Sequence, residues 1–170
     1  MDRDQFCAGM RKLAGGVTII TARDSAGIRC GLTVTAVCSL STEPPSLIAC
    51  VNLQSSVARA LQEARHFAVN ILSSAHRRVA ETFAGRHGLA RDERFAHGLW
   101  INGESGLPIL GDARCSFECE LAESRPFGTH RILIGHVLHT RSTEGEAPPL
   151  VYGNGSFLAA FAPPSLTAAG

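Results

Sequence analysis

The stretch Arg114-Cys-Ser-Phe-Glu-Cys-Glu-Leu121 alternates apolar and polar residues at every second position. This alternation is the periodicity of a half-buried β-strand, and it predicts a strand over residues 114–123. Cys115 and Cys119 share the apolar face of that strand. Four residues of strand span ~13 Å, beyond the ~7 Å between Cα atoms that a disulfide tolerates, so we expect both thiols to remain free.

Strand-like stretches recur on both sides of this segment. Turn-forming residues separate them, and they cover residues 17–22, 29–38, 46–52, 67–72 and 129–140. Apolar residues at helical spacing predict one helix over 4–14, and two short helices fit over 55–63 and 75–84. Six strands with few helices favour an antiparallel, closed or nearly closed barrel, because closure hides strand edges.

Length and composition predict a single domain. The chain has 170 residues, of which 45% are hydrophobic and 18% charged, and this is enough to bury one core. We expect the domain to cover residues 1–162 and a disordered tail to follow over 163–170. Residues 85–110, rich in Gly, His and Arg, predict a long irregular excursion, and excursions of that length are usually functional or interfacial.

Charge and cysteine usage exclude several classes of protein. The net charge is +1 with no run of like charge, so we expect neither nucleic acid nor an acidic membrane surface as a partner. No stretch approaches the ~20 apolar residues of a membrane helix, and the N-terminus leads into no apolar signal core. The six cysteines form no Cys-x-x-Cys pair, which is typical of buried thiols in a reducing cell. We therefore expect a cytoplasmic protein.

Common catalytic motifs are absent. The only lysine is Lys12, and no phosphate-binding Gly-x-x-x-x-Gly-Lys loop exists. Gly153-Asn154-Gly155 begins a dinucleotide fingerprint, but Leu158 stands at the position of its third glycine. Gly-x-Ser-x-Gly and His-Glu-x-x-His are also missing. His130 and His136 share a strand face but lie ~20 Å apart, so no metal site is expected.

Two patterns suggest a ligand site. A strand ends at Asn52, after which Ser55 and Ser56 start a predicted short helix with Arg59 one turn later. Amides, hydroxyls and a guanidinium can converge there on an anion. Taken alone, the pattern is more typical of a serine that only caps the helix, with Arg59 in solvent. The second pattern is Gly31-Leu-Thr-Val-Thr-Ala-Val-Cys-Ser39, whose small side chains let a flat ligand approach the backbone. It is equally compatible with plain sheet.

Several motifs in order resemble the flavin reductase-like family of FMN-binding split barrels. They are Gly31–Ser39 with Pro44-Pro45-Ser46, Cys50-Val-Asn-Leu-Gln-Ser55, Phe67-Ala-Val-Asn-Ile-Leu72, Phe83-Ala-Gly85, Asp92-Glu-Arg-Phe95 and Gly128-Thr-His130. Within the family they are most similar to the reductase component of 4-hydroxyphenylacetate 3-monooxygenase and to the pyrimidine-degradation flavin reductase. The resemblance implies a mainly β (α+β) fold, an antiparallel Greek-key split β-barrel with a few peripheral helices.

The resemblance also implies roles for individual residues. His130 would face the nicotinamide, or would simply begin a strand. Phe83, Ala84 and Gly85 would close over the flavin, although Phe83 could belong to the core. The isoalloxazine would contact Thr33, Val34, Thr35 and Ala36, and the ribityl phosphate would be held by Cys50, Val51, Asn52, Ser55 and Ser56.

The implied activity is hydride transfer from NADH or NADPH to FMN or FAD, with reduced flavin supplied to a flavin-dependent monooxygenase. Because small barrels are filled by side chains, we expect the site outside the barrel, walled by residues 85–110 and a second subunit of a homodimer. After Tyr152 the chain departs from its relatives, which continue with aromatic residues and paired arginines. The alternatives are a non-catalytic flavin-binding or sensing protein, an oxidase resembling pyridoxamine-phosphate oxidase, and a cob(II)yrinic acid reductase.

Overall fold

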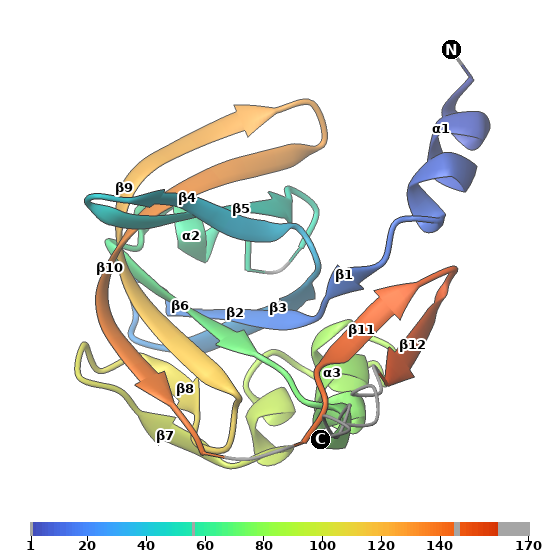
Figure 1. Ribbon diagram of the computed structural model, residues 1–170. Helices are drawn as coiled ribbons and strands as arrows, with labels where there is room; N and C mark the ends of the chain where they lie inside the picture. Colours follow the sequence, from blue (N-terminus) through green and yellow to red (C-terminus); the bar gives the residue numbers. More distant parts are fainter. Residues whose placement is uncertain (1, 56, 145–146, 160–170) are drawn as a thin grey trace, which may run out of the picture.

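A seven-stranded antiparallel sheet forms the body of the protein (Figure 1). The computed structural model describes residues 2–55, 57–144 and 147–159. In sheet order the strands are β3 (Arg29–Val34), β2 (Thr18–Arg23), β6 (His66–Ile71), β9 (Cys115–Phe127), β10 (His130–Ser142), β5 (Pro45–Asn52) and β4 (Val37–Thr42). The long hairpin of β9 and β10 lies in the middle of the sheet. The predicted mainly β, antiparallel fold with few helices is confirmed.

The strand predicted over 29–38 is instead two strands, β3 and β4, which lie at opposite edges of the sheet. Only Thr35 and Ala36 separate them, and so short a link spans at most ~10 Å. The sheet must therefore curl until its two edges meet at this link. The carbonyl of Ala36 accepts a hydrogen bond from the amide of Cys50 at 2.9 Å, which ties the link to β5. A break in one predicted strand thus produces the nearly closed barrel.

Side chains fill the interior of the barrel. Ile20, Val51, Phe67 and Leu133 are among its fully buried members. Gly135 on β10 is required at this point, because a Cβ there would lie 2.6 Å from the ring of Phe67. Around Phe67 the side chains therefore leave no space for a ligand.

A second core lies beneath the barrel. It packs the helix α3 (Arg77–Phe83) against strand β2 and the 85–110 segment, and the 3-10 helix η1 (Ser74–His76) leads into α3 and contacts the later strand at residues 150–153. That segment was predicted to be irregular. It is instead ordered around a 3-10 helix, η2 (Glu93–Ala96), and a hairpin of β7 (Trp100–Asn102) and β8 (Pro108–Leu110).

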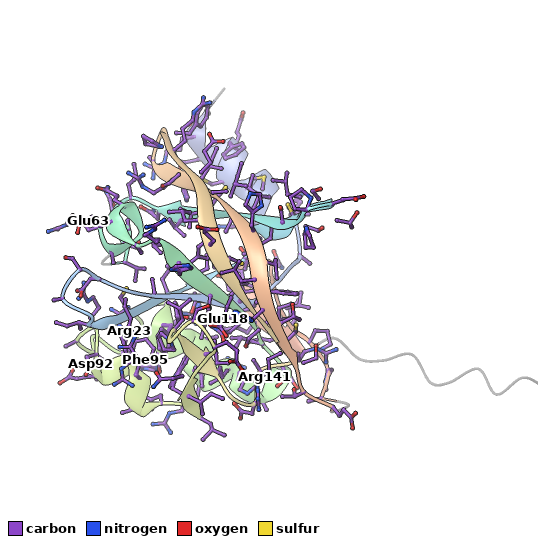
Figure 2. All side chains as sticks on the ribbon, turned by 90° about the vertical axis from the view of Figure 1, so that its left-hand side faces the viewer. Arg23, Glu63, Asp92, Phe95, Glu118 and Arg141 are labelled. Atoms are coloured by element: carbon purple, nitrogen blue, oxygen red, sulfur yellow. The ribbon has the colours of Figure 1, made fainter. Side chains whose placement is uncertain are left out.

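The β7–β8 hairpin covers the polar face of β9. Glu118, on that face, is only 4% exposed and accepts hydrogen bonds from the amides of Glu104 at 2.9 Å and Ser105 at 2.7 Å. Figure 2 labels Glu118 where β9 passes the hairpin. The carboxylate is buried because the hairpin turn supplies the donors that water would otherwise supply.

The two ends of the described chain meet in a small sheet of β1 (Gly15–Gly16), β11 (Leu150–Gly153) and β12 (Ser156–Ala159). The helix α1 (Arg3–Arg11) precedes it and projects from the body, as Figure 1 shows. Its bounds are close to those of the helix predicted over 4–14.

The helix predicted over 55–63 is shorter in the structure, where α2 is Ala60–Glu63. The predicted tail over 163–170 lies outside the described residues. Within the part of the chain that the structure describes, no helix is long and apolar enough to cross a membrane.

Candidate functional site

A cavity of about 310 Å³ lies outside the barrel, against the β3–β4 link. Three parts of the fold border it: the link itself, the adjoining ends of β5 and β10, and the end of α3 with the β11–β12 hairpin. Its lining residues are Leu32, Thr33, Val34, Thr35, Ala36, Cys50, Asn52, Ala84, Arg86, His130, Tyr152 and Phe157. The structure thus brings together Thr33, Val34, Thr35, Ala36, Cys50, Asn52, Ala84 and His130 from the residues that the sequence singled out.

A larger cavity of about 530 Å³ is bordered by six strands of the barrel, namely β2, β4, β5, β6, β9 and β10. It is lined mainly by Val37, Leu47, Val69, Phe117 and Val137 with several serines and threonines, and none of its lining residues is charged. None of the predicted site residues reaches it. We therefore place the candidate site in the smaller cavity, where polar groups converge.

The β3–β4 link forms one wall with open backbone. Thr35 and Ala36 lie outside the strands and are exposed, and among the described residues neither amide has a hydrogen-bond acceptor. The hydroxyl of Thr33 donates to the carbonyl of Ala80 at 2.7 Å, which holds the end of β3 on α3. This wall offers free N–H donors beside small side chains, a surface suited to a flat ligand with acceptors along one edge.

The ends of β5 and β10 form the second wall. Asn52 and His130 are direct partners in the β5–β10 register. The side-chain oxygen of Asn52 accepts from the amide of Gln54 at 2.8 Å. The side-chain nitrogen has no acceptor among the described residues, so its hydrogens are available to a ligand. Thr129 Oγ1 lies 2.9 Å from His130 Nδ1, which orients the exposed imidazole.

The expected phosphate segment is built differently from the prediction. The α-helix begins at Ala60, not at Ser55, so no helix N-terminus points from Ser55. The Ser55 side chain accepts from the amide of Ala58 at 3.2 Å and closes a turn. Val51 is fully buried in the barrel, and neither it nor Ser55 lines the cavity. Ser56 lies outside the described residues.

Phe83 lies beneath the cavity rather than on it. Its side chain is 1% exposed, and its ring centroid is 5.0 Å from that of Phe95 and 5.1 Å from that of Trp100. Gly31 makes room for it, because a Cβ at Gly31 would lie 2.7 Å from the Phe83 ring. The structure therefore places Phe83 in the second core and leaves it no surface with which to cover a ligand.

Four lining residues were not predicted as site residues: Leu32, Arg86, Tyr152 and Phe157. The rings of Tyr152 and Phe157 pack edge to face at 5.1 Å across the β11–β12 hairpin. Asn154 and Gly155 form its turn with φ values of 51° and 81°, as the turn of a type I′ hairpin requires. The Asn-Gly pair was thus a local signal for this hairpin and its two aromatic residues. Arg86 has no comparable signal, because it is one of several arginines in the 85–110 segment.

Neither fully buried cysteine is a reactive group of the site. Burial raises the pKa of the Cys30 thiol to about 11 and that of the Cys119 thiol to about 12, so both stay protonated. Cys50 is the thiol that lines the cavity. In the residues placed by the structure, no group of three or more His, Cys, Asp or Glu side chains gathers as metal ligands would.

Comparisons with known proteins agree on one family. Residues 10–160 match the family model described as flavin reductase like domain. The FMN reductase (NADH) RutF 1 of Methylorubrum extorquens is 40% identical over 152 residues, 89% of this chain and 74% of that protein. The 4-hydroxyphenylacetate 3-monooxygenase reductase component of Salmonella typhi is 38% identical over 132 residues, 78% of this chain and 77% of that protein. The solved structure of the Streptomyces globisporus NADH:FAD oxidoreductase SgcE6, in complex with NAD and FAD fragments, has a TM-score of 0.85 at 26% identity and covers 96% of this chain and 95% of that chain.

Proposed function

The chain belongs to the family of flavin reductase like domains, and we propose that it is a flavin reductase that uses NADH or NADPH. The reaction passes a hydride from the dihydronicotinamide to FMN or FAD, and the reduced flavin then serves a flavin-dependent monooxygenase. The observation that carries the proposal is the cavity at the β3–β4 link, where the amides of Thr35 and Ala36 stand free of acceptors among the described residues.

The residues at this cavity fit a flavin. The link and the end of β3, from Thr33 to Ala36, would border the ring, with amides available to its acceptor edge. Asn52 at the cavity, and Ser55 in the turn that follows it outside the cavity lining, would serve the phosphate as neutral donors. The Asn52 side-chain nitrogen and the Ser55 hydroxyl hydrogen have no partner among the described residues. When bound, the flavin supplies a ring that accepts the hydride.

The protein's own part in this reaction is alignment. His130, oriented by Thr129, would face the nicotinamide from the β10 wall. Tyr152 and Phe157 supply an apolar wall on the opposite side that keeps water away from the reacting rings. Holding two rings in reacting contact can supply ~7–11 kcal/mol of the barrier. An acid–base pair is therefore not required for a large rate enhancement.

The quaternary state we propose is a homodimer. The helix α1 has no buried residue, and Phe6 and Met10 on it are 56% and 49% exposed. A helix this short is marginal in water unless something packs against it, and a second copy of the chain would supply the cover. We also propose a cytoplasmic location, which the six free cysteines support.

The test is NADH oxidation by the purified protein with added flavin. We expect the rate to rise with free FMN or FAD and to saturate, and the protein to support a flavin-dependent monooxygenase supplied separately. NADPH in a parallel series measures the nucleotide preference. A protein that retains its flavin through purification, ignores added flavin and oxidises neither nucleotide would instead be a flavin store or sensor.

A further inference from the structure

Arg86 is held at the cavity by the way in which α3 ends. The amide of Arg86 donates to the carbonyl of Glu81 at 3.2 Å, and that of Gly85 donates to the carbonyl of Thr82 at 3.1 Å. With Gly85 at φ +80°, these two bonds form a Schellman motif. Glycine adopts this left-handed conformation without the steric cost of a side chain. The backbone at Arg86 is thus fixed, and its side chain leaves from the helix end toward the β11–β12 hairpin.

The guanidinium of Arg86 lies over an aromatic ring. Its central carbon is 5.1 Å from the centroid of Phe157, within the range of a cation–π contact. Of the described carboxylates, only Glu81 pairs with it, at 3.8 Å from Nη1, and Glu81 is already hydrogen-bonded at 3.1 Å to Arg77. Among the described residues the Arg86 guanidinium makes no hydrogen bond, and its side chain is 46% exposed. Its N–H donors are therefore available to a ligand.

Arg86 also supplies the positive charge of this cavity. Of the described residues that line it, Arg86 is the only lysine or arginine. It stands on the wall made by α3 and β12, whereas Asn52 and His130 stand on the wall made by β5 and β10. If the flavin phosphate lies at the Asn52 wall, the charge of Arg86 serves the anionic part of the other reactant.

We propose that Arg86, laid over Phe157, binds the phosphates of the nicotinamide dinucleotide and thereby sets the affinity for the hydride donor. This inference rests on the proposed flavin reductase function and adds the residue that recognises the donor. A guanidinium suits this role because it offers several N–H donors in a plane and pairs with phosphate oxygens in bidentate fashion. Phe157 holds that plane in place while leaving the donors free.

The experiment compares two hydride donors that differ in charge. NADH carries two phosphates, whereas 1-benzyl-1,4-dihydronicotinamide carries none and has the same reacting ring. Steady-state oxidation of each is measured at saturating FMN for the wild type, Arg86→Ala, Arg86→Lys and the control Arg78→Ala. Arg78 is an exposed arginine of α3 that does not line the cavity. The KM for FMN is measured in parallel.

The expected result is selective for the charged donor. Arg86→Ala raises the KM for NADH roughly tenfold or more, and leaves the KM for the uncharged donor and for FMN unchanged. Arg86→Lys gives a smaller rise in the KM for NADH, because lysine keeps the charge but lacks the planar set of N–H donors. Arg78→Ala behaves as the wild type. An equal loss with both donors, or a rise in the KM for FMN instead, overturns the proposal.

Failure of the proposed function is visible separately, as a wild type that oxidises neither donor. In that event NAD⁺ binding by calorimetry replaces kinetics. Weaker binding to Arg86→Ala than to the wild type and Arg78→Ala supports the role of Arg86, and equal binding by all three proteins refutes it.

Discussion

Replacing Phe83 with alanine separates the two roles that its sequence context allows, a lid on the ligand or a member of the core. The structure supports the core: the ring is 1% exposed, packs on Gly31, and lies about as far from Phe95 as from Trp100, at 5.0 and 5.1 Å. The substitution removes a fully buried ring and leaves a cavity between α3, β3 and the 85–110 segment.

The expected cost is large. Replacing phenylalanine with alanine in a packed core lowers the free energy of unfolding by ~3–5 kcal/mol. This figure includes the lost transfer free energy of the ring and the cost of the cavity that it leaves. For a chain of this length each kcal/mol lowers Tm by ~2–4 °C, so we expect a fall of about 6–20 °C. Thermal unfolding followed by circular dichroism measures this shift, and urea titration at 15 °C measures the free energy.

The same variant is then assayed for flavin. At 15 °C, where it remains folded, Phe83→Ala should keep its FMN affinity and its NADH oxidation, since Phe83 does not line the cavity. Phe127→Ala is the matched control. Phe127 is 68% exposed, and its loss should change the free energy of unfolding by no more than ~0.5 kcal/mol. A Phe83→Ala protein as stable as this control but deficient in FMN binding would refute the placement of Phe83 in the core.

Two further predictions concern His130 and Asp24. His130→Ala should raise the KM for NADH or slow hydride transfer while FMN affinity stays nearly intact; steady-state and binding measurements check this, and unchanged kinetics would assign His130 to the strand alone. A hydrogen bond from the amide of Ile28 is the main reason why the pKa of the Asp24 carboxyl lies below its usual range. The hydrogen bond and charge of Arg91 lower it further, and desolvation opposes both. A depressed folded pKa stabilises the fold above the unfolded value of ~3.9 and loses that contribution as the pH falls. The Tm advantage of the wild type over Asp24→Asn should therefore be present at pH 7 and shrink below pH ~4, and an advantage that stays constant down to pH 3 would contradict it.

The local pattern was sufficient for most strands and two helices. Alternation identifies 114–123, which overlaps the first part of β9, and the short helix predicted over 75–84 corresponds to η1 and α3. The prediction of a single strand over 29–38 was wrong, because both halves of this segment have the composition of a strand. The break at Thr35 and Ala36 arises where a curled sheet brings its two edges together, and such long-range pairing leaves no local trace. The β11–β12 hairpin was missed because its strands are short, although its Asn154-Gly155 turn marked it.

The sequence alone shows which residue types the candidate site contains, whereas the tertiary structure decides how they are arranged. Asn52 and His130 could be singled out one by one, but only the β5–β10 register makes them neighbours. The sequence left Phe83 as either a cover for the flavin or a member of the core, and packing alone decides that it faces Phe95 and Trp100. In the sequence nothing distinguishes Arg86 from the other arginines, and only the end of α3 places its guanidinium over the ring of Phe157. A one-dimensional pattern specifies which groups a segment carries, whereas contacts between distant segments decide which groups share a cavity.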